Sequence, residues 1–156
     1  MGNFSSKVIW GEVHDVEGGG SLEDLNTNPL EDLVIPVTLA SNAVLPDYAT
    51  AGAASMKLLS VDPVQLAPGI PKVVDTGVKL DLPFMLVAHV TGSRTLAERG
   101  ITAHAEYLSC DDRESIKVLL TLDKGADPHC LQEDEPIAML TILPCARPGL
   151  EQKGEL

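Results

Sequence analysis

A segment near residue 50 combines very small side chains with a single charge. The stretch AGAASMKL, residues 51–58, begins with residues small enough to let two backbones approach closely, which is how many nucleotide sites begin. The charged residue that follows is Lys57, although a site that holds a cation beside phosphates needs a carboxylate at such a place. Lys57 is therefore the first residue that a functional interpretation has to explain.

Other residue types that often carry chemistry are scattered along the chain. The four histidines are His14, His89, His104 and His129. The three cysteines are Cys110, Cys130 and Cys145. No Cys-x-x-Cys spacing occurs, and the side chains of the adjacent pair His129 and Cys130 would point to opposite faces of a strand. These spacings predict no metal site, no disulfide framework and no cofactor.

The bulk composition restricts the partners that we expect. A chain of 156 residues fits one domain, and its 23 acidic against 11 basic side chains leave a net charge of -12. Such a charge repels nucleic acid and anionic lipid surfaces, and no basic patch offsets it. The sequence also lacks an apolar stretch long enough for a membrane span and lacks a signal peptide. We expect a soluble intracellular protein that is not secreted, with the N-terminal MGNFSS as a weak match to the myristoylation pattern at Gly2.

Three regions differ in composition. Residues 1–35 form an acidic, Gly-rich arm in which only KVIWGEV is typical of a strand. Residues 36–144 consist of short β-branched and aliphatic runs separated by Pro-Gly, Thr-Gly and Lys-Gly turn signals, which predict an all-β sandwich or barrel. The one helix-like window, DLPFMLVAHV, is rich in valine and follows a proline, so we predict a strand there. Residues 145–156 form a short polar tail.

The order of these strands resembles the trimeric dUTP diphosphatase (dUTPase) family over about residues 44–144. The resemblance is carried by LPDYATAGAASMKL, VQLAPGIPKVVDTGVKLDLP, GSRTLAERGI and DEPIAMLTILP. It implies a jelly-roll β-barrel that assembles as a homotrimer with active sites shared between subunits. In that family Mg²⁺ bridges the triphosphate, an Asp general base activates water, and a Gly-rich C-terminal arm closes over the nucleotide.

Each chemical motif of the family is altered here. The first motif has Ser55, Met56 and Lys57 where the family has Gly, an aromatic residue and Asp. The second has Ser93 and Arg94 in swapped order, which leaves Arg94 or Arg99 as a candidate anion ligand.

The third, fourth and fifth motifs depart further. The resemblance places Cys110 at the position of the base, Asp112 at the second acid and Arg113 at the tyrosine, although a shift of one or two residues would place Asp111 or Asp112 at the base. The fourth has Met139 in place of an amide, and the fifth has no Gly-rich counterpart.

The altered motifs lead to one main prediction and two alternatives. We predict a catalytically inactive pseudoenzyme that serves as a structural trimer, most concretely a viral (phage) capsid decoration or cement protein in the virion. The alternatives are a nucleotide-binding module without hydrolysis and an active Mg²⁺-dependent dUTP diphosphatase. Lys57 is expected to form an ion pair with Asp111 or Asp112 in place of a metal bridge.

Two sets of residues follow from these predictions. The former nucleotide site comprises Gly52, Ser55, Lys57, Ser93, Arg94, Cys110, Asp112, Arg113 and Met139. The arm that would dock on a protein partner, such as a capsid protein, is represented by Lys7, Trp10, Glu12 and Glu17.

Overall fold

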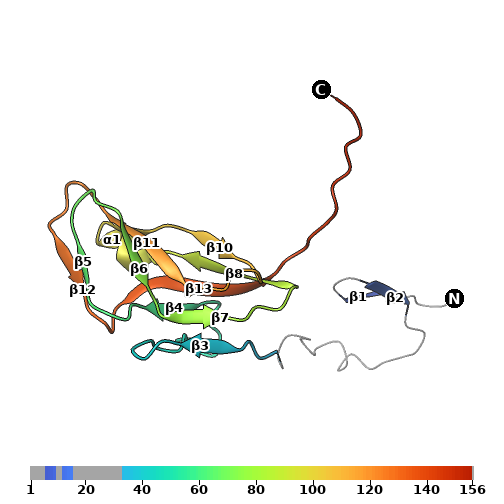
Figure 1. Cartoon of the computed structure of the whole chain (residues 1–156), viewed down its shortest axis with the longest axis horizontal. Helices are drawn as coiled ribbons and strands as arrows, with labels where there is room; N and C mark the ends of the chain where they lie inside the picture. The colour runs from blue at the N-terminus through green and yellow to red at the C-terminus, as the bar shows by residue number, and fades with distance from the viewer. Residues whose placement is uncertain (1–5, 10–11, 16–32, 156) are drawn as a thin grey trace. The chain divides into compact units, whose positions relative to one another are not determined.

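A computed structural model describes residues 6–9, 12–15 and 33–155 of the chain (Figure 1). The chain separates into two compact units, Met1–Val34 and Ile35–Leu156. In the described residues nearly all regular structure is β-strand, which confirms the predicted all-β class. No helix in this described part is long and apolar enough to cross a membrane.

The described residues contain the following elements. The strands are β1 Ser6–Ile9, β2 Glu12–Asp15, β3 Val37–Leu39, β4 Met56–Leu59, β5 Val64–Leu66, β6 Lys72–Asp75, β7 Val78–Leu80, β8 Leu86–Thr91, β9 Ile101–Ala103, β10 Glu106–Leu108, β11 Lys117–Leu122, β12 His129–Leu131 and β13 Pro136–Pro144, and the helix is α1 Arg94–Glu98.

The first unit contains a β-hairpin where the sequence predicted a single strand. Strands β1 and β2 pair antiparallel, with Ser6 opposite Asp15 and Ile9 opposite Glu12. The segment KVIWGEV therefore spans parts of two strands. Lys7 lies in β1 and Glu12 in β2, whereas Trp10, Glu17 and Gly2 lie outside the described residues. The predicted docking role of this arm stays a prediction.

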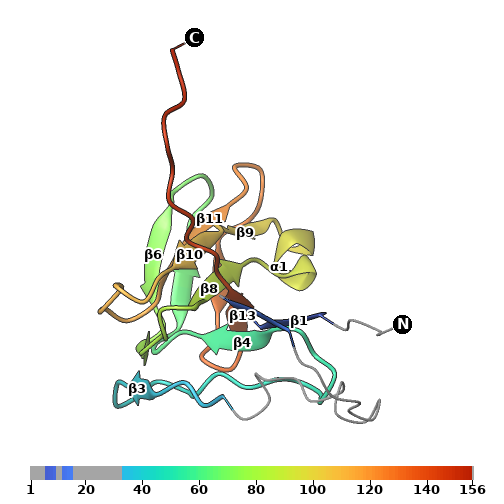
Figure 2. The same cartoon turned by 90° about the vertical axis from the view of Figure 1, so that its right-hand side faces the viewer.

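The second unit is built from four small sheets. One sheet has the strand order β10-β8-β13-β4, and a second has the order β6-β11-β9. Two further pairs, β12-β5 and β3-β7, complete the unit. Figure 2 shows this unit from the side, with α1 beside β9 at one flank.

Alternation along the strands explains how these sheets enclose a core. In β8 every second residue is buried, namely Leu86, Ala88 and Val90, because successive side chains of a strand point to opposite faces. The same alternation occurs in β11. Aliphatic residues of both sheets, such as Leu120 and Leu140, meet in one cluster. The core contains leucine, valine, isoleucine and alanine, as the low aromatic content required.

Helix α1 was not predicted from the sequence, because it spans only residues 94–98. The Ser93 hydroxyl accepts a hydrogen bond from the Leu96 backbone N–H at 3.3 Å, which caps the first turn. Leu96 is almost fully buried and anchors the helix to the core. The predicted strand in DLPFMLVAHV is confirmed over β8, which ends three residues before this helix.

A tight turn at Thr76 and Gly77 connects β6 to β7. The buried Thr76 hydroxyl donates to the Ile116 carbonyl oxygen at 2.8 Å and accepts from the Val78 N–H at 3.2 Å. Gly77 has a φ of 64°, in the left-handed region that favours glycine. A Cβ added at Gly77 would lie 2.7 Å from a Val61 methyl group and 2.8 Å from the Ala43 Cβ.

Replacing Gly77 by alanine is expected to lower the free energy of unfolding by about 2–4 kcal/mol, since backbone strain and overpacking add together. Urea unfolding followed by circular dichroism measures the change. The matched control is Gly125→Ala, because a Cβ at Gly125 has no heavy atom within 4 Å. A Gly77 variant as stable as this control would contradict the role given to the turn.

Candidate functional site

Strand pairing brings the first and fourth motifs together. Lys57 in β4 lies opposite Met139 in β13, and Met139 lies opposite Thr91 in β8. These three residues form a row across three neighbouring strands, which we call the Lys57 row. Because cross-strand partners share one face of a sheet, the three side chains lie on the same face.

The Lys57 row lies on the face of the sheet that points away from the core. The adjacent residues Leu58, Leu140 and Val90 are buried, whereas Lys57 is exposed and Met139 and Thr91 are half-buried. Ser93 and Arg94 follow Thr91 by two and three residues in the chain. The fold therefore places Lys57 beside Met139, and Ser93 and Arg94 come after the end of the strand that completes the row.

Only one of the two candidate arginines of the second motif is available to a ligand. The Arg94 side chain is 91% exposed, and its one ion-pair contact among the described residues is with Glu98 at 3.9 Å. Arg99, by contrast, donates to a Glu135 carboxylate oxygen at 2.7 Å and also contacts the Nε2 atom of His129. Arg94 is thus the candidate anion ligand, and Arg99 is structural.

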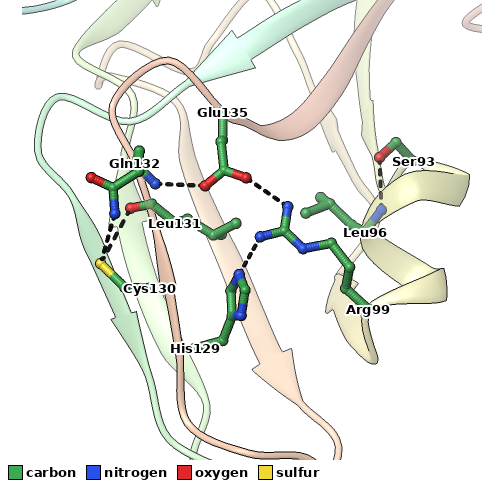
Figure 3. A network of polar contacts seen from close by, with 8 residues as sticks. All are labelled: Ser93, Leu96, Arg99, His129, Cys130, Leu131, Gln132 and Glu135. Atoms are coloured by element: carbon green, nitrogen blue, oxygen red, sulfur yellow. Dashed lines mark hydrogen bonds and ion pairs between the residues drawn. The ribbon is translucent and has the colours of Figure 1, made fainter.

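The Arg99 network holds α1 against the segment between β12 and β13 (Figure 3). Glu135 accepts from the Gln132 backbone N–H with its other oxygen at 2.8 Å. This backbone hydrogen bond, followed by the Arg99 side chain, lowers the pKa of Glu135 below its usual 4.5. The sequence analysis missed this network because its members lie 30 and 36 residues apart.

Replacing Glu135 by glutamine is expected to remove about 1 kcal/mol of stability at neutral pH, since the pair is only partly buried. The lowered pKa means that the unfolded chain binds the proton more tightly. The contribution is therefore present above about pH 4.5 and is lost as the pH falls through the lower value in the folded state. Urea unfolding between about pH 3 and 7 should show the two proteins converging in acid.

The control for this measurement is Glu133→Gln, a nearby exposed acid with no hydrogen bond or ion pair to other described residues. It should leave the pH dependence of the wild type in place. A constant difference between wild type and Glu135→Gln at every pH would contradict an ionic contribution.

A pocket of about 430 Å³ lies at the loop between β10 and β11. Its walls are apolar on one side, with Leu80, Leu82 and Leu108, and charged on the other, with acidic residues and two cations. The third-motif residues Asp111, Asp112 and Arg113 all line it, whereas Cys110 does not. An apolar wall facing convergent polar groups is typical of a small-ligand site.

The two carboxylates of this loop have different roles. One oxygen of Asp112 accepts from the Ser109 N–H at 2.6 Å and from the Ser109 hydroxyl at 3.1 Å, so Asp112 stabilises the turn. The side chain of Asp111 is exposed and accepts only a long contact, at 4.0 Å, from the Cys110 thiol. Asp111 is therefore the carboxylate that is free to act on a ligand.

The cations of the pocket are paired with acids. The Arg113 guanidinium lies 3.0 Å from Asp81, and the Lys117 ammonium lies 2.8 Å from Glu114. The hydrogen bond from Lys117 lowers the pKa of Glu114, and the same bond raises the pKa of Lys117. Arg113, which the resemblance places at the family's tyrosine position, is thus ion-paired with Asp81 of the same chain.

The pocket and the Lys57 row lie at different ends of β8 in one chain. Leu108 pairs with Ala88, and the following loop continues away from Thr91. Ala88, beside the start of the pocket loop, and Thr91, in the Lys57 row, are three residues apart along β8, a distance of about 10 Å. No ion pair joins Lys57 to Asp111 or Asp112 within the chain, so the predicted pair is wrong there.

The small residues before β4 do not make a close backbone approach within the chain. Gly52 is exposed, and a Cβ added to it would have no heavy atom within 4 Å. Ser55 is half-buried immediately before β4. The structure of one chain does not test whether these residues belong to a former nucleotide site, so this stays a prediction.

The Mg²⁺ ion that the family resemblance implies does not fit the residues present. The Lys57 row offers one hydroxyl, on Thr91, and an ammonium, which repels a cation. In the pocket Asp112 and Glu114 already accept hydrogen bonds from Ser109 and Lys117, which leaves the carboxylates of Asp111 and Glu106. Among the residues that the structure describes, no group of three His, Cys, Asp or Glu side chains could hold a metal.

The strand order and the aliphatic core together define an all-β chain built from small antiparallel sheets. The family model for dUTPase matches residues 41–156. The chain therefore belongs to the dUTPase family, as the resemblance indicated.

Curated relatives agree with this family. Two of them are the deoxyuridine 5'-triphosphate nucleotidohydrolases of Cutibacterium acnes, 33% identical over 130 residues, and of Anaeromyxobacter sp. (strain Fw109-5), 34% identical over 109 residues. The alignments cover 81% of this chain and 85% of the first relative, and 68% of this chain and 74% of the second.

Solved structures share the fold. A dUTPase from phage phi11 of S. aureus superposes with a TM-score of 0.73 at 18% identity, covering 79% of this chain and 98% of that one. The dUTPase of Staphylococcus bacteriophage 80alpha gives 0.69 at 18% identity, covering 79% and 97%. This likeness confirms the dUTPase-like fold.

These relatives overturn the prediction of an inactive scaffold. They are named as nucleotidohydrolases, so the prediction of a pseudoenzyme with a capsid role is wrong, and an enzyme is better supported. The physical reason for the error lies in the third motif. The sequence comparison placed Cys110 at the base position, whereas Asp111 and Asp112 line the pocket and Cys110 does not.

Proposed function

We propose that this chain is a dUTP diphosphatase, which hydrolyses deoxyuridine 5'-triphosphate to the monophosphate and pyrophosphate. The observation that carries the proposal is the pocket of about 430 Å³ with the free Asp111 carboxylate, in a chain whose curated relatives are nucleotidohydrolases acting on this substrate. The apolar side of the pocket is suited to a base and sugar.

In the proposed reaction Asp111 acts as the general base. Its carboxylate accepts a proton from a water molecule, whose oxygen forms a bond to the α-phosphorus. The bond between that phosphorus and the bridging oxygen breaks, and pyrophosphate leaves with the electron pair. The proton passes from Asp111 to solvent, which restores the carboxylate for the next turnover.

The proposed active site is shared between copies of the chain in a homotrimer. Within one chain the pocket and the Lys57 row lie apart, at different ends of β8. The pocket of one copy would hold the nucleoside, and the Lys57 row of a second copy would lie beside the phosphates. Closed symmetry of this kind repeats the same contact at each site.

Purified full-length protein incubated with dUTP tests the proposal directly. A coupled assay measures pyrophosphate, and dCTP, dTTP and UTP serve as comparison substrates. Release from dUTP well above the protein-free rate is the expected result. Binding of a non-hydrolysable dUTP analogue without pyrophosphate release from any substrate would contradict hydrolysis.

A further inference from the structure

The most unusual feature of the Lys57 row is a cation where the family needs a metal-ordering acid. We propose that this chain holds the triphosphate through the side chains of Lys57 and Arg94 directly, so that nucleotide binding does not depend on a protein-bound Mg²⁺ ion. The inference rests on the proposed function for the identity of the nucleotide. It follows from the disagreement between the residues present and the metal that the fold family implies.

Lys57 is free to contact a ligand. Its side chain is exposed on the outer face of the sheet, between the buried Leu58 and the half-buried Met56. No described carboxylate lies within 4.0 Å of its ammonium. The acid next to it in the fold is Asp47, whose carbonyl oxygen accepts from the Lys57 N–H and whose carboxylate accepts from the Tyr48 N–H.

The neighbours of Lys57 in the row carry no charge and offer no carboxylate to a metal ion. Met139 and Thr91 are uncharged, so the Lys57 ammonium is the single formal charge on the row. An ammonium repels a divalent cation and attracts a phosphate at the same distance. In a chain with a net charge of -12, the unpaired Lys57 ammonium between uncharged side chains can attract an anion.

Arg94 extends this positive surface beyond the end of β8. It follows Thr91 by three residues, and its guanidinium is almost fully exposed with only a 3.9 Å contact to Glu98. Arg99 supplies the contrast, because Glu135 and His129 hold its guanidinium. A guanidinium can bind two phosphate oxygens at once, and an ammonium adds a compact charge beside it.

The chain offers a matched control for Lys57. Lys79 lies in β7 and, like Lys57, has no ion pair among the described residues. Its strand pairs with β3, in a different sheet from the Lys57 row. Lys79→Met therefore removes the same charge from the protein without touching the proposed site.

The test is calorimetric binding of α,β-imido-dUTP at constant ionic strength, once with excess EDTA and once with Mg²⁺. The wild type is expected to bind with similar Kd in both, within about threefold. Lys57→Met should weaken binding in EDTA by about 10-fold or more, Lys57→Arg should retain most of the affinity, and Lys79→Met should bind as the wild type does. Thermal unfolding of each variant shows that it is folded.

Two results would overturn the inference. One is a loss of wild-type binding by more than tenfold in EDTA, and the other is a Lys57→Met protein that binds as tightly as the wild type. Both differ from failure of the proposed function, which is the absence of pyrophosphate release. A protein that hydrolyses dUTP but needs Mg²⁺ for binding retains the proposed function and loses this inference.

Discussion

Replacing Asp111 by asparagine is expected to slow pyrophosphate release from dUTP by about 10²–10⁴-fold, the loss typical when a general base is removed. Asparagine has almost the same shape as aspartate but cannot accept the proton of water. The side chain is exposed and has only a long contact with the Cys110 thiol, so the fold loses little by the change. The Kd of a non-hydrolysable dUTP analogue should stay within a few-fold of the wild-type value.

Two variants make this result specific. Asp127→Asn removes an exposed acid that has no hydrogen bond or ion pair to the described residues, and it should leave kcat unchanged. Asp112→Asn tests the other carboxylate of the loop, which accepts two hydrogen bonds from Ser109. A larger fall in kcat for Asp112→Asn than for Asp111→Asn, with both proteins equally stable, would move the base to Asp112.

Mixing two inactive variants is expected to restore activity to about a quarter of the wild-type value, because each site of the proposed trimer would draw its two halves from different copies. The variants are Asp111→Asn, which alters the pocket, and Arg94→Glu, which reverses the charge of the second proposed phosphate ligand. In random trimers formed by co-refolding, about one site in four combines an intact pocket with an intact row. Each protein alone is expected to be almost inactive.

The control for the mixing experiment is co-refolding of the single variant Asp111→Asn with the double variant Asp111→Asn/Asp127→Asn. In this mixture every pocket lacks the proposed base. No activity should return. Mixtures of Asp111→Asn and Arg94→Glu that stay inactive after co-refolding, although size-exclusion chromatography shows trimers, would contradict a shared site. Activity that returns in monomers would contradict it as well.

The β-strands were predictable because their signal is local. Alternating burial in β8 follows directly from the spacing of Leu86, Ala88 and Val90, and turn residues separate neighbouring strands. Helix α1 was not predictable in the same way. It is five residues long, and its stability depends on the Ser93 cap and on the burial of Leu96 in a core made by distant strands.

The candidate site was only partly predictable. The sequence selected Lys57, Arg94 and Met139 one motif at a time, and the registers of β4, β13 and β8 then placed Lys57 and Met139 side by side. The predicted Lys57 ion pair failed because both its partners lie on the loop after β10, beyond the opposite end of β8. The sequence comparison also selected Cys110, since an alignment by spacing cannot tell which residue of a turn faces a pocket.

The amino-acid sequence by itself determined the all-β class, the family and the charge at position 57, because each depends on residue types and on spacings of a few residues. Only the tertiary structure decided which residues meet. In the structure Arg99 contacts Glu135 and His129, whereas Arg94 stays exposed. Asp111 lines the pocket and Cys110 does not. The physical reason is that these contacts join residues far apart in the chain, and strand register, which depends on packing of the whole core, brings them together.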